Sequence, residues 1–511
     1  MRYGLLTFLL LGLVSAVGAR GGGAEVTDHA ATAIADTYDA LPPTRIADTR
    51  AGAGYQNSGR TLGPGGTINV EVSGIDGVPA TGAGAVVLNV TAVNPTAPSF
   101  ITVFAEGATQ PIVASLSFTT GETVSNLVTV PVGSQGGVAI YNHTGNTDVV
   151  VDLEGYYTTS PHATGLYNPV NPTRVFGTLQ VGGNISSGVS KSITVTGGST
   201  GIPTGASAIV ANVTAAGSTG SSFLTVYPAP SSGTPTPPTA ANVNFTAGEV
   251  IGNRVTVPVG ANGQIEVYNN TGSVDVDVDL NGYYTGLPGE LGSAFTPLSP
   301  SRFTDTRVAT NGSVLEADNT ETFTFTSEGI PSIATALAGN ATVLSGAASG
   351  FLTIYPVNES TPPSVGDVAI NSNAVAQNFA LAPLNGGSVK MFNSSASPVN
   401  IVIDAFGYFA PPPPAVHVSA SSTSVPANGM STSSLTVSVT TGSGVAFDDP
   451  VSLTTTPSVS GSCGIASATG STNASGQVTS TYTASTTAGT CTITATEANG
   501  GTSGSVVITQ T

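Results

Sequence analysis

DLEGYY at residues 152–157 returns as DLNGYY at 279–284 and as DAFGYF at 404–409. The segment before each copy repeats too, because Pro-Thr/Ser-Arg triplets place an arginine at 45, 174 and 302. Between these markers, FITVF at 100–104 matches FLTVY at 223–227 and FLTIY at 351–355. The distance between copies is that of a whole domain, far longer than the ~20–50 residues of a solenoid repeat. The chain therefore contains three tandem copies of one domain.

Within a copy, short apolar runs alternate with turn residues. Examples are the runs 67–72, 85–93, 100–105 and 147–153, which are rich in Val, Ile and Thr. Short strands with turn signals every ~8–12 residues are typical of a sandwich or barrel. The 64 Gly and 34 Pro also disfavour long helices. We predict an all-β protein with three β-sandwich repeats, jelly-roll-like or Ig-like in topology.

The charge balance excludes several classes of partner. The chain has 11 basic and 29 acidic residues, for a formal charge of -18. Nucleic-acid binding depends on neutralising phosphates with Lys and Arg, so neither nucleic acid nor an anionic lipid surface is an expected partner. Charged residues are only 8% of the chain, against about 25% in an average soluble protein.

The N-terminus predicts export. Arg2 precedes a short apolar stretch at 5–17, and Val-Gly-Ala at 17–19 fits a cleavage site. The stretch is too short for a transmembrane helix of about 20 residues, so we expect no membrane span in the mature chain. The expected organisation is a signal peptide (1–19), a flexible tail (20–41), β-sandwich repeats (42–158, 168–285, 297–410), a proline linker (411–415) and a C-terminal domain (416–511). With linkers at 158–168 and 285–296, the repeats should be arranged like beads on a string.

The repeats resemble the roughly 120-residue tandem repeats of exported proteins of actinobacteria and related bacteria. The resemblance rests on R-x-x-D-T-R at 45–50 and 302–307, LNVT at 88–91 and the closing hexapeptide, and it covers about residues 41–410. It implies an appendage of surface and cell-wall proteins. The second copy departs from the motif, since Gly177 and Leu179 replace the Asp and the second Arg.

The C-terminal segment has a different pattern, with SVPANG at 424–429 and NASGQV at 473–478. It resembles the invasin/intimin-type bacterial Ig-like domain, which implies a seven-stranded sandwich that serves as a spacer or adhesive module. The chain's two cysteines, Cys463 and Cys491, both lie in this segment. Two cysteines in an exported protein predict one disulfide.

Each repeat keeps one charge of each sign at matching positions. We predict partly buried salt bridges that tie the first segment of each repeat to its last strand. An arginine that binds a ligand carboxylate is the alternative. The predicted pairs are Arg45–Asp152, Arg174–Asp279 and Arg302–Asp404.

The closing aromatic residues have two interpretations. One ring of each pair could stack on a ligand such as a sugar, or the pair could fill the end of the sandwich core. The candidate stacking residues are Tyr157, Tyr284 and Phe409.

We expect no cofactor, no metal site and no catalytic site. The four His residues are scattered and no copy repeats one, so no Ser-His-Asp or Cys-His set can be assembled. Asp275, Asp277 and Asp279 lie on one strand face and could offer oxygens to Ca²⁺. Only the last of the three recurs in every copy, which disfavours a shared metal site.

The sequence thus predicts a non-enzymatic, extracellular or cell-surface protein with a structural or adhesive role. The alternative is an array of glycan- or cell-wall-binding modules that acts by avidity. The expected partner is a glycan or protein surface of the cell envelope or the extracellular space, with self-association as a further option.

Overall fold

The structure is a computed structural model of the 511-residue chain. It describes residues 36–158, 165–177, 184–287, 291–308, 313–344, 346–412, 414–441, 444–445, 448–463, 469–498 and 502–511. The predicted signal peptide at 1–19 lies outside the described residues, as does most of the predicted tail. The chain divides into two compact units, of which the first contains the three repeats and the second contains Pro411–Thr511.

Each repeat is a sandwich of two four-stranded antiparallel sheets. The first contains β1 (Thr37–Asp48), β2 (Thr67–Glu71), β3 (Ala83–Val93), β4 (Ser99–Ala105), β5 (Leu116–Phe118), β6 (Val124–Pro131), β7 (Gly137–Asn142) and β8 (Asp148–Thr158). The second contains β9 (Tyr167–Gly177), β10 (Val189–Thr194), β11 (Ala208–Ala216), β12 (Ser222–Pro228), β13 (Val243–Phe245), β14 (Ile251–Pro258), β15 (Gln264–Asn269) and β16 (Asp275–Tyr284). The third contains β17 (Ala294–Asp305), β18 (Asn319–Thr324), β19 (Ala336–Leu344), β20 (Gly350–Pro356), β21 (Val368–Ile370), β22 (Val375–Pro383), β23 (Ser388–Asn393) and β24 (Asn400–Ala410).

The two sheets of a repeat have different neighbours. The inner sheets have the strand orders β1-β8-β3-β6, β9-β16-β11-β14 and β17-β24-β19-β22. The outer sheets have the orders β2-β7-β4-β5, β10-β15-β12-β13 and β18-β23-β20-β21. Each repeat has its own core between its two sheets, and a fourth apolar cluster is built from the inner sheets of all three repeats.

Strand β3 explains how one sheet can serve two cores. Its side chains alternate between the two faces of the inner sheet. Val86, Leu88 and Val90 pack in the core of the first repeat, whereas Ala85 and Val87 pack in the shared cluster. Because both faces are buried, the run is continuously apolar rather than alternating.

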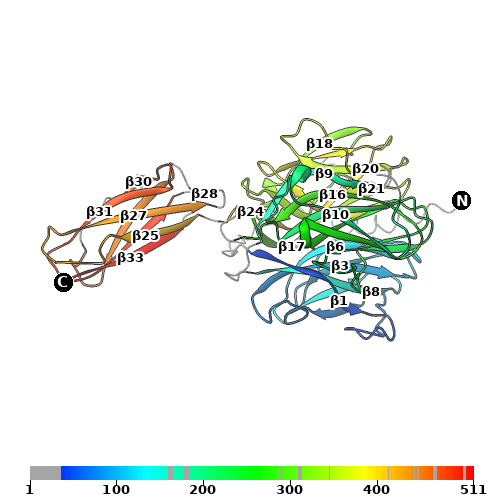
Figure 1. The fold of residues 1–511 in the computed structure, drawn as a ribbon, viewed down its shortest axis with the longest axis horizontal. Coiled ribbons are helices and arrows are strands. Elements are labelled where there is room, and N and C mark those ends of the chain that lie inside the picture. The colour runs from blue at the N-terminus through cyan, green and yellow to red at the C-terminus, as the bar shows by residue number, and fades with distance from the viewer. Residues whose placement is uncertain are drawn as a thin grey trace. The chain divides into compact units, whose positions relative to one another are not determined.

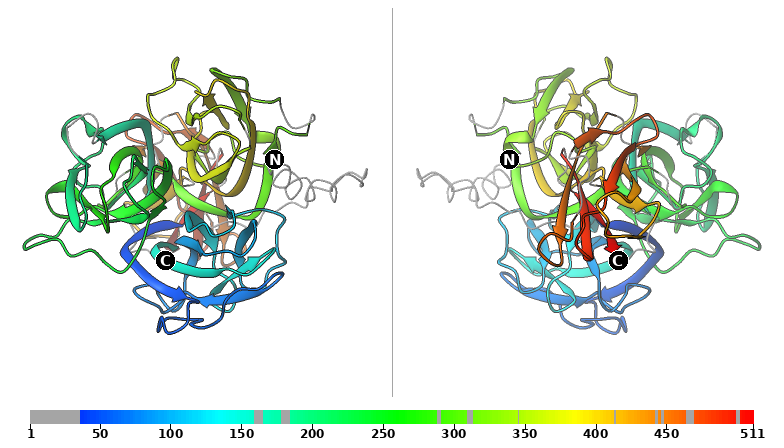
Figure 2. Two further views of the ribbon diagram at one scale, coloured as in Figure 1. Left: turned by 90° about the vertical axis from the view of Figure 1, so that its right-hand side faces the viewer. Right: turned by 90° about the vertical axis from the view of Figure 1, so that its left-hand side faces the viewer.

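The expectation of beads on a string is therefore wrong. The three repeats form one closed ring, which we call the three-repeat ring, and Figure 2 shows its blue-to-cyan, green and yellow parts side by side around one centre. Backbone hydrogen bonds between Asp36 and Phe295 join the first repeat to the third. The expected tail and linkers also contribute to the fold, since β1 begins at Thr37, β9 at Tyr167 and β17 at Ala294.

The second unit is a smaller β-sandwich (Figure 1). One sheet pairs β25 (Ala415–Ala420), β27 (Thr432–Thr441), β28 (Gly444–Val445) and β31 (Gln477–Thr483). The other has the order β26 (Ser424–Val425), β33 (Ser503–Gln510), β32 (Gly489–Glu497), β29 (Pro450–Pro457) and β30 (Thr469–Ser471). Nine strands replace the seven that were expected, and β26 and β28 are only two residues long.

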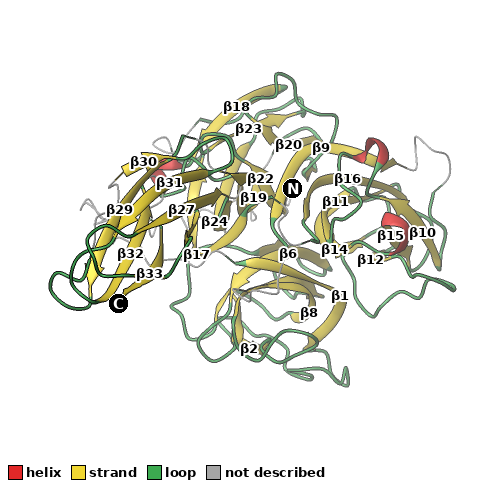
Figure 3. Cartoon of the chain, turned by 60° about the vertical axis from the view of Figure 1, so that its left-hand side comes forward, coloured by secondary structure: helices red, strands yellow, loops and turns green. Residues whose placement is uncertain are grey.

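The all-β prediction is confirmed (Figure 3). The only helices in the described residues are three 3-10 turns, at Gly198–Thr200, Ala261–Gly263 and Thr326–Glu328. None of them has the length or the apolar character that a bilayer span requires.

Candidate functional site: the interfaces between repeats

The recurrent Arg and Asp of each repeat lie side by side on adjacent strands. In the first repeat, β1 pairs with β8 so that Arg45 is opposite Asp152. The guanidinium donates from Nε to Oδ1 at 2.9 Å and from Nη2 to Oδ2 at 3.3 Å. The equivalent Nε–Oδ1 distances are 2.8 Å for Arg174–Asp279 and 2.9 Å for Arg302–Asp404. In each of the three predicted pairs, the Arg and Asp side chains are therefore within hydrogen-bonding distance.

These carboxylates also reach the neighbouring repeat. The backbone N–H of Ala241, in the second repeat, donates to Asp152 Oδ2 at 3.1 Å. Ala114 of the first repeat plays the same part for Asp404 of the third. Burial raises the pKa of Asp152, and the hydrogen bonds and charge of Arg45 oppose that rise. The Arg45–Asp152 and Arg302–Asp404 pairs thus lie where one repeat meets the next.

A second carboxylate flanks each of these arginines. In the first repeat Asp48 lies 3.7 Å from Arg45 and 2.5 Å from Arg50. Burial raises the pKa of Asp48, but the hydrogen bonds and charge of Arg50 outweigh burial and hold the pKa below its usual value. Asp305 in the third repeat has the same arrangement with Arg302 and Arg307.

The second repeat preserves this second carboxylate by a different route. Gly177 stands where the other repeats have Asp48 and Asp305. Asp277, at the position of Val150 and Val402, instead lies 2.8 Å from Arg174. The acidic run that suggested a cation site therefore supplies two carboxylates to one arginine. Within the described ranges, no cluster of three or more His, Cys, Asp or Glu side chains is placed to hold a metal ion.

A groove follows the boundary between the first and third repeats. Its volume is about 40 Å³, which suits a few water molecules and is far below the ~300–1,000 Å³ of a drug-sized ligand site. Its lining includes Phe100 of the first repeat together with Arg302, Arg307 and Asp404 of the third. Phe100 also stacks on the exposed ring of His143, with centroids 4.7 Å apart.

The closing aromatic residues are not available to a ligand. Tyr157, Tyr284 and Phe409 are at most 1% exposed and lie in the shared cluster. Each packs against an aromatic ring on the first strand of another repeat, with centroid distances of 4.3–4.6 Å for Tyr38–Tyr284, Tyr167–Phe409 and Phe295–Tyr157. The ligand-stacking interpretation is therefore wrong, because these six rings form the centre of the three-repeat ring.

The glycine of the closing hexapeptide has a related role. A Cβ on Gly155 would overlap the ring of Tyr38, and one on Gly282 would overlap Tyr167. Gly407 has the same relation to Phe295. The motif keeps a glycine because the aromatic ring of the first strand packs directly on its backbone.

Six asparagines, which we call the asparagine ring, join the repeats in a cycle. Sequence reasoning missed half of them, although an amide inside an apolar strand at matching positions was a usable signal. The other half stand at the start of N-x-T triplets, at 89–91, 212–214 and 340–342. The side-chain amides donate to the partner Oδ1 at 2.7–2.9 Å in Asn126→Asn340, Asn253→Asn89 and Asn378→Asn212.

Backbone groups complete the cycle in the same sense at every interface. The N–H groups of Leu127, Arg254 and Phe379 donate to Asn253, Asn378 and Asn126 at 2.9–3.1 Å. The amides of Asn89, Asn212 and Asn340 donate to the carbonyls of Ala241, Gly366 and Ala114. All six asparagines are at most 1% exposed, so none can accept a glycan in the folded ring.

In the second unit, Cys463 and Cys491 form a disulfide with an S–S distance of 2.06 Å. Cys491 lies in β32, and its side chain packs in one of the two cores of this sandwich.

No family model matches the chain, and no curated protein matches it. Among solved structures, the D0-D1 domain of intimin is 19% identical, covers 37% of this chain and 89% of its own, and has a TM-score of 0.15. A structure of Sulfolobus turreted icosahedral virus is 12% identical, covers 73% of this chain and 90% of its own, and has a TM-score of 0.16.

Proposed function

We propose that the protein is a non-catalytic, exported surface protein with a structural or adhesive role. In this proposal the three-repeat ring is a rigid head that presents a contact surface. The Ig-like domain acts as a spacer after the proline-rich segment.

The closed ring is the observation that carries the proposal. Its repeats share one apolar cluster and a cycle of buried hydrogen bonds, so they hold fixed positions relative to one another. A rigid block suits a scaffold or a contact head, whereas enzymes commonly depend on loops that open and close. The disulfide in the second unit supports an oxidising, extracellular setting.

Localisation and adhesion test the proposal directly. Cells of the producing organism are fractionated, and intact cells are treated with protease before an antibody to the ring is applied. We expect the protein in the medium or in a protease-sensitive form on the cell surface. A deletion strain should also lose attachment to its substratum or show an altered envelope. A protein found only in the cytoplasm would contradict the proposal.

A second candidate function is recognition of a glycan that lies over the mouth of the groove between the first and third repeats, since the groove itself holds only a few water molecules. The supporting observation is that Phe100 and paired Arg–Asp side chains line one groove, since saccharide sites combine an aromatic face with fixed polar groups. The matching positions in the other repeats carry Phe223 and Phe351.

The glycan hypothesis is tested with the full mature chain, because the repeats share a core. The chain is applied to a glycan array and to isolated cell-wall material, alongside the variant Phe100→Ala. Binding that weakens in this variant supports glycan recognition. Surface localisation without any glycan binding supports the structural role alone.

A further inference from the structure

The three interfaces of the ring share one scaffold but differ at three buried positions. The first is the residue after the amide of the asparagine ring, in β6, β14 or β22. The second is the third residue of the closing hexapeptide, and the third precedes the short strand β5, β13 or β21. We call each set of three an interface triad. The triads are Leu127/Glu154/Asn242, Arg254/Asn281/Asp367 and Phe379/Phe406/Ser115.

Local structure aims these side chains into the interfaces. Glu154 is an extra residue in β8, because Gly155 pairs with Val87 while Leu153 pairs with the next residue, Leu88. The same register shift occurs at Asn281 and at Phe406. A β-bulge turns one side chain out of the regular alternation. The third member is fixed as well, since Ser115, Asn242 and Asp367 each accept a backbone N–H from the adjacent strand.

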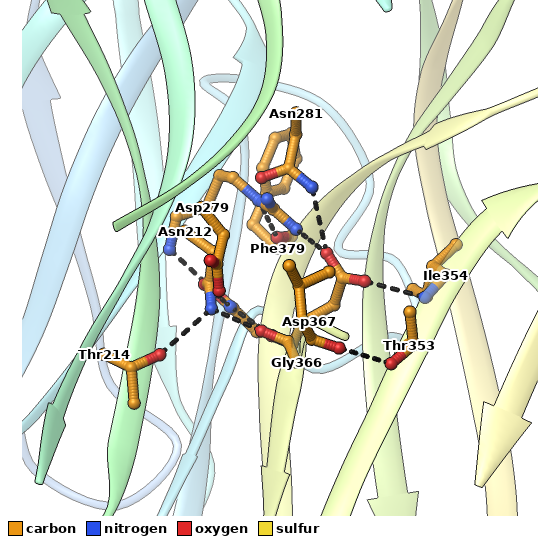
Figure 4. A network of polar contacts seen from close by, with 12 residues as sticks. Asn212, Thr214, Asp279, Asn281, Thr353, Ile354, Gly366, Asp367 and Phe379 are labelled. Carbon is orange, nitrogen blue, oxygen red and sulfur yellow. Dashed lines mark hydrogen bonds and ion pairs between the residues drawn. The ribbon is translucent and has the colours of Figure 1, made fainter. Parts of the chain in front are cut away.

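The interface between the second and third repeats is held by a buried ion pair (Figure 4). Arg254 Nη2 lies 2.6 Å from Asp367 Oδ1, and both side chains are at most 3% exposed. Asn281 donates to the same carboxylate oxygen at 3.2 Å, and Arg254 Nε donates to the carbonyl of Phe379 at 3.2 Å. The guanidinium of the second repeat therefore requires an acid on the third.

The interface between the first and second repeats has the opposite polarity. Glu154 is fully buried, and its carboxyl oxygens accept hydrogen bonds from the second repeat. The side-chain amide of Asn242 donates at 2.6 Å and the backbone N–H of Thr256 donates at 2.9 Å. Here the acid is on the earlier repeat and requires a donor on the later one.

The interface between the third and first repeats is apolar at the matching positions. Phe379 and Phe406 stack with centroids 6.3 Å apart, and both are 1% exposed. Ser115, on the first repeat, accepts a hydrogen bond at its hydroxyl oxygen from the backbone N–H of Val103. This interface offers no partner to a buried charge.

We propose that each interface triad matches one neighbouring repeat only, so that the ring assembles with one copy of each repeat in a single order. A guanidinium at the place of Arg254 would be unpaired against Asn242 or Ser115. The carboxyl oxygens of Glu154 would face the carboxylate of Asp367 in place of a donor if the first repeat packed on the third. A buried charge without its partner is strongly destabilising, whereas the shared asparagine ring tolerates any order.

This order has a consequence for the outer surface. The boundaries between repeats are not interchangeable, because each is formed by a fixed pair of repeats. The groove between the first and third repeats is therefore presented at a fixed place on the ring. The proposal concerns assembly and holds whatever the ring binds.

Exchanging triads within the full chain tests the proposal. The matched variant exchanges the two polar triads completely, by Leu127→Arg, Glu154→Asn, Asn242→Asp, Arg254→Leu, Asn281→Glu and Asp367→Asn. The mismatched variant carries only the changes at 127, 154, 254 and 281. It leaves Asn242 opposite a guanidinium and Asp367 opposite a second carboxyl group. Both are compared with the wild-type chain by urea unfolding and by size-exclusion chromatography.

We expect the matched variant to fold as a monomer with a folded-to-unfolded ratio within about tenfold of wild type. The mismatched variant has fewer substitutions but should lose at least about a hundredfold in that ratio, or should associate. A mismatched variant as stable and monomeric as the matched one would overturn the proposal. Equal losses in both variants would overturn it as well, because the triads would then not act as matched sets.

Discussion

Glu154 makes the stability of the three-repeat ring depend on pH. Its carboxyl group is fully buried, and desolvation raises its pKa from 4.5 to about 8. The two neutral donors, Asn242 and the backbone of Thr256, favour the charged form but offset only part of this effect. Among the residues that the structure describes, no lysine or arginine stabilises the charged form of Glu154.

The sign of the effect follows from proton linkage. Between pH 4.5 and 8 the folded chain keeps the proton of Glu154, whereas the unfolded chain has lost it. The contribution of Glu154 to the free energy of unfolding is therefore fully present below pH 4.5. It falls as pH rises, by about 1.4 kcal/mol per pH unit for one proton. Over the whole interval the loss amounts to about 5 kcal/mol and then levels off above pH 8.

The assay is urea unfolding of wild type and Glu154→Gln between pH 4.5 and 9. The glutamine does not titrate, so the difference between the two curves isolates this carboxyl from other acids, such as Asp36, whose pKa is raised to about 6. We expect the free energy of unfolding of wild type to fall relative to the variant across this range. The absolute offset is not the test, because the new amide meets two donors. Parallel curves for the two proteins would refute the reasoning.

Three further predictions concern other contacts. Asn253→Ala should lower the free energy of unfolding of the ring by about 3 kcal/mol, since it removes three buried hydrogen bonds, while exposed Asn319→Ala should change it by less than about 0.5 kcal/mol. Tyr157→Phe should cost about 1–2 kcal/mol in chemical unfolding, because it leaves the hydroxyl of Tyr284 unpaired at a 2.6 Å contact; adding Tyr284→Phe should recover part of the loss. Cys463→Ser should destabilise the second unit by about 3.5 kcal/mol, from the loop entropy of 28 residues, and calorimetry should show the transition of the ring unchanged. The first prediction is contradicted if Asn253→Ala and Asn319→Ala are equally stable. The second is contradicted if the double tyrosine variant recovers none of the lost stability, and the third if loss of the disulfide shifts the unfolding transition of the ring.

The strand content and the repeats follow from the sequence because they depend on local pattern. The hexapeptides fix the period, and matching positions bring Arg45 and Asp152 together in the structure once β1 and β8 are paired. Local pattern does not specify what covers the far face of a sheet. A strand with period-two alternation can leave that face to solvent or bury it against another domain.

Signals for ring closure were nevertheless present. In an isolated repeat, the face of the inner sheet that carries Ala85 and Val87 would be exposed to water. A repeat that folded alone would be expected to carry polar residues on that face. Asn126 interrupts an apolar strand at a position where an unpaired amide would be costly. Both features indicate a missing partner. Identifying that partner as the next repeat required the arrangement of sheets in space, because matching side chains such as Arg254 and Asp367 lie far apart in the sequence and meet only in the folded ring.

The distribution of charge narrows the choice of ligand. Of the 11 basic residues, six arginines are committed to aspartates in or beside the interfaces: Arg45, Arg50, Arg174, Arg254, Arg302 and Arg307. These pairs consume most of the positive charge of a chain whose formal charge is -18. An anionic polymer would meet net repulsion and few free cations, so the proposed contact surface suits a neutral saccharide or a protein. Binding of such a partner should change little between low and high salt, whereas binding through phosphate or carboxylate charges would weaken steeply as salt is added.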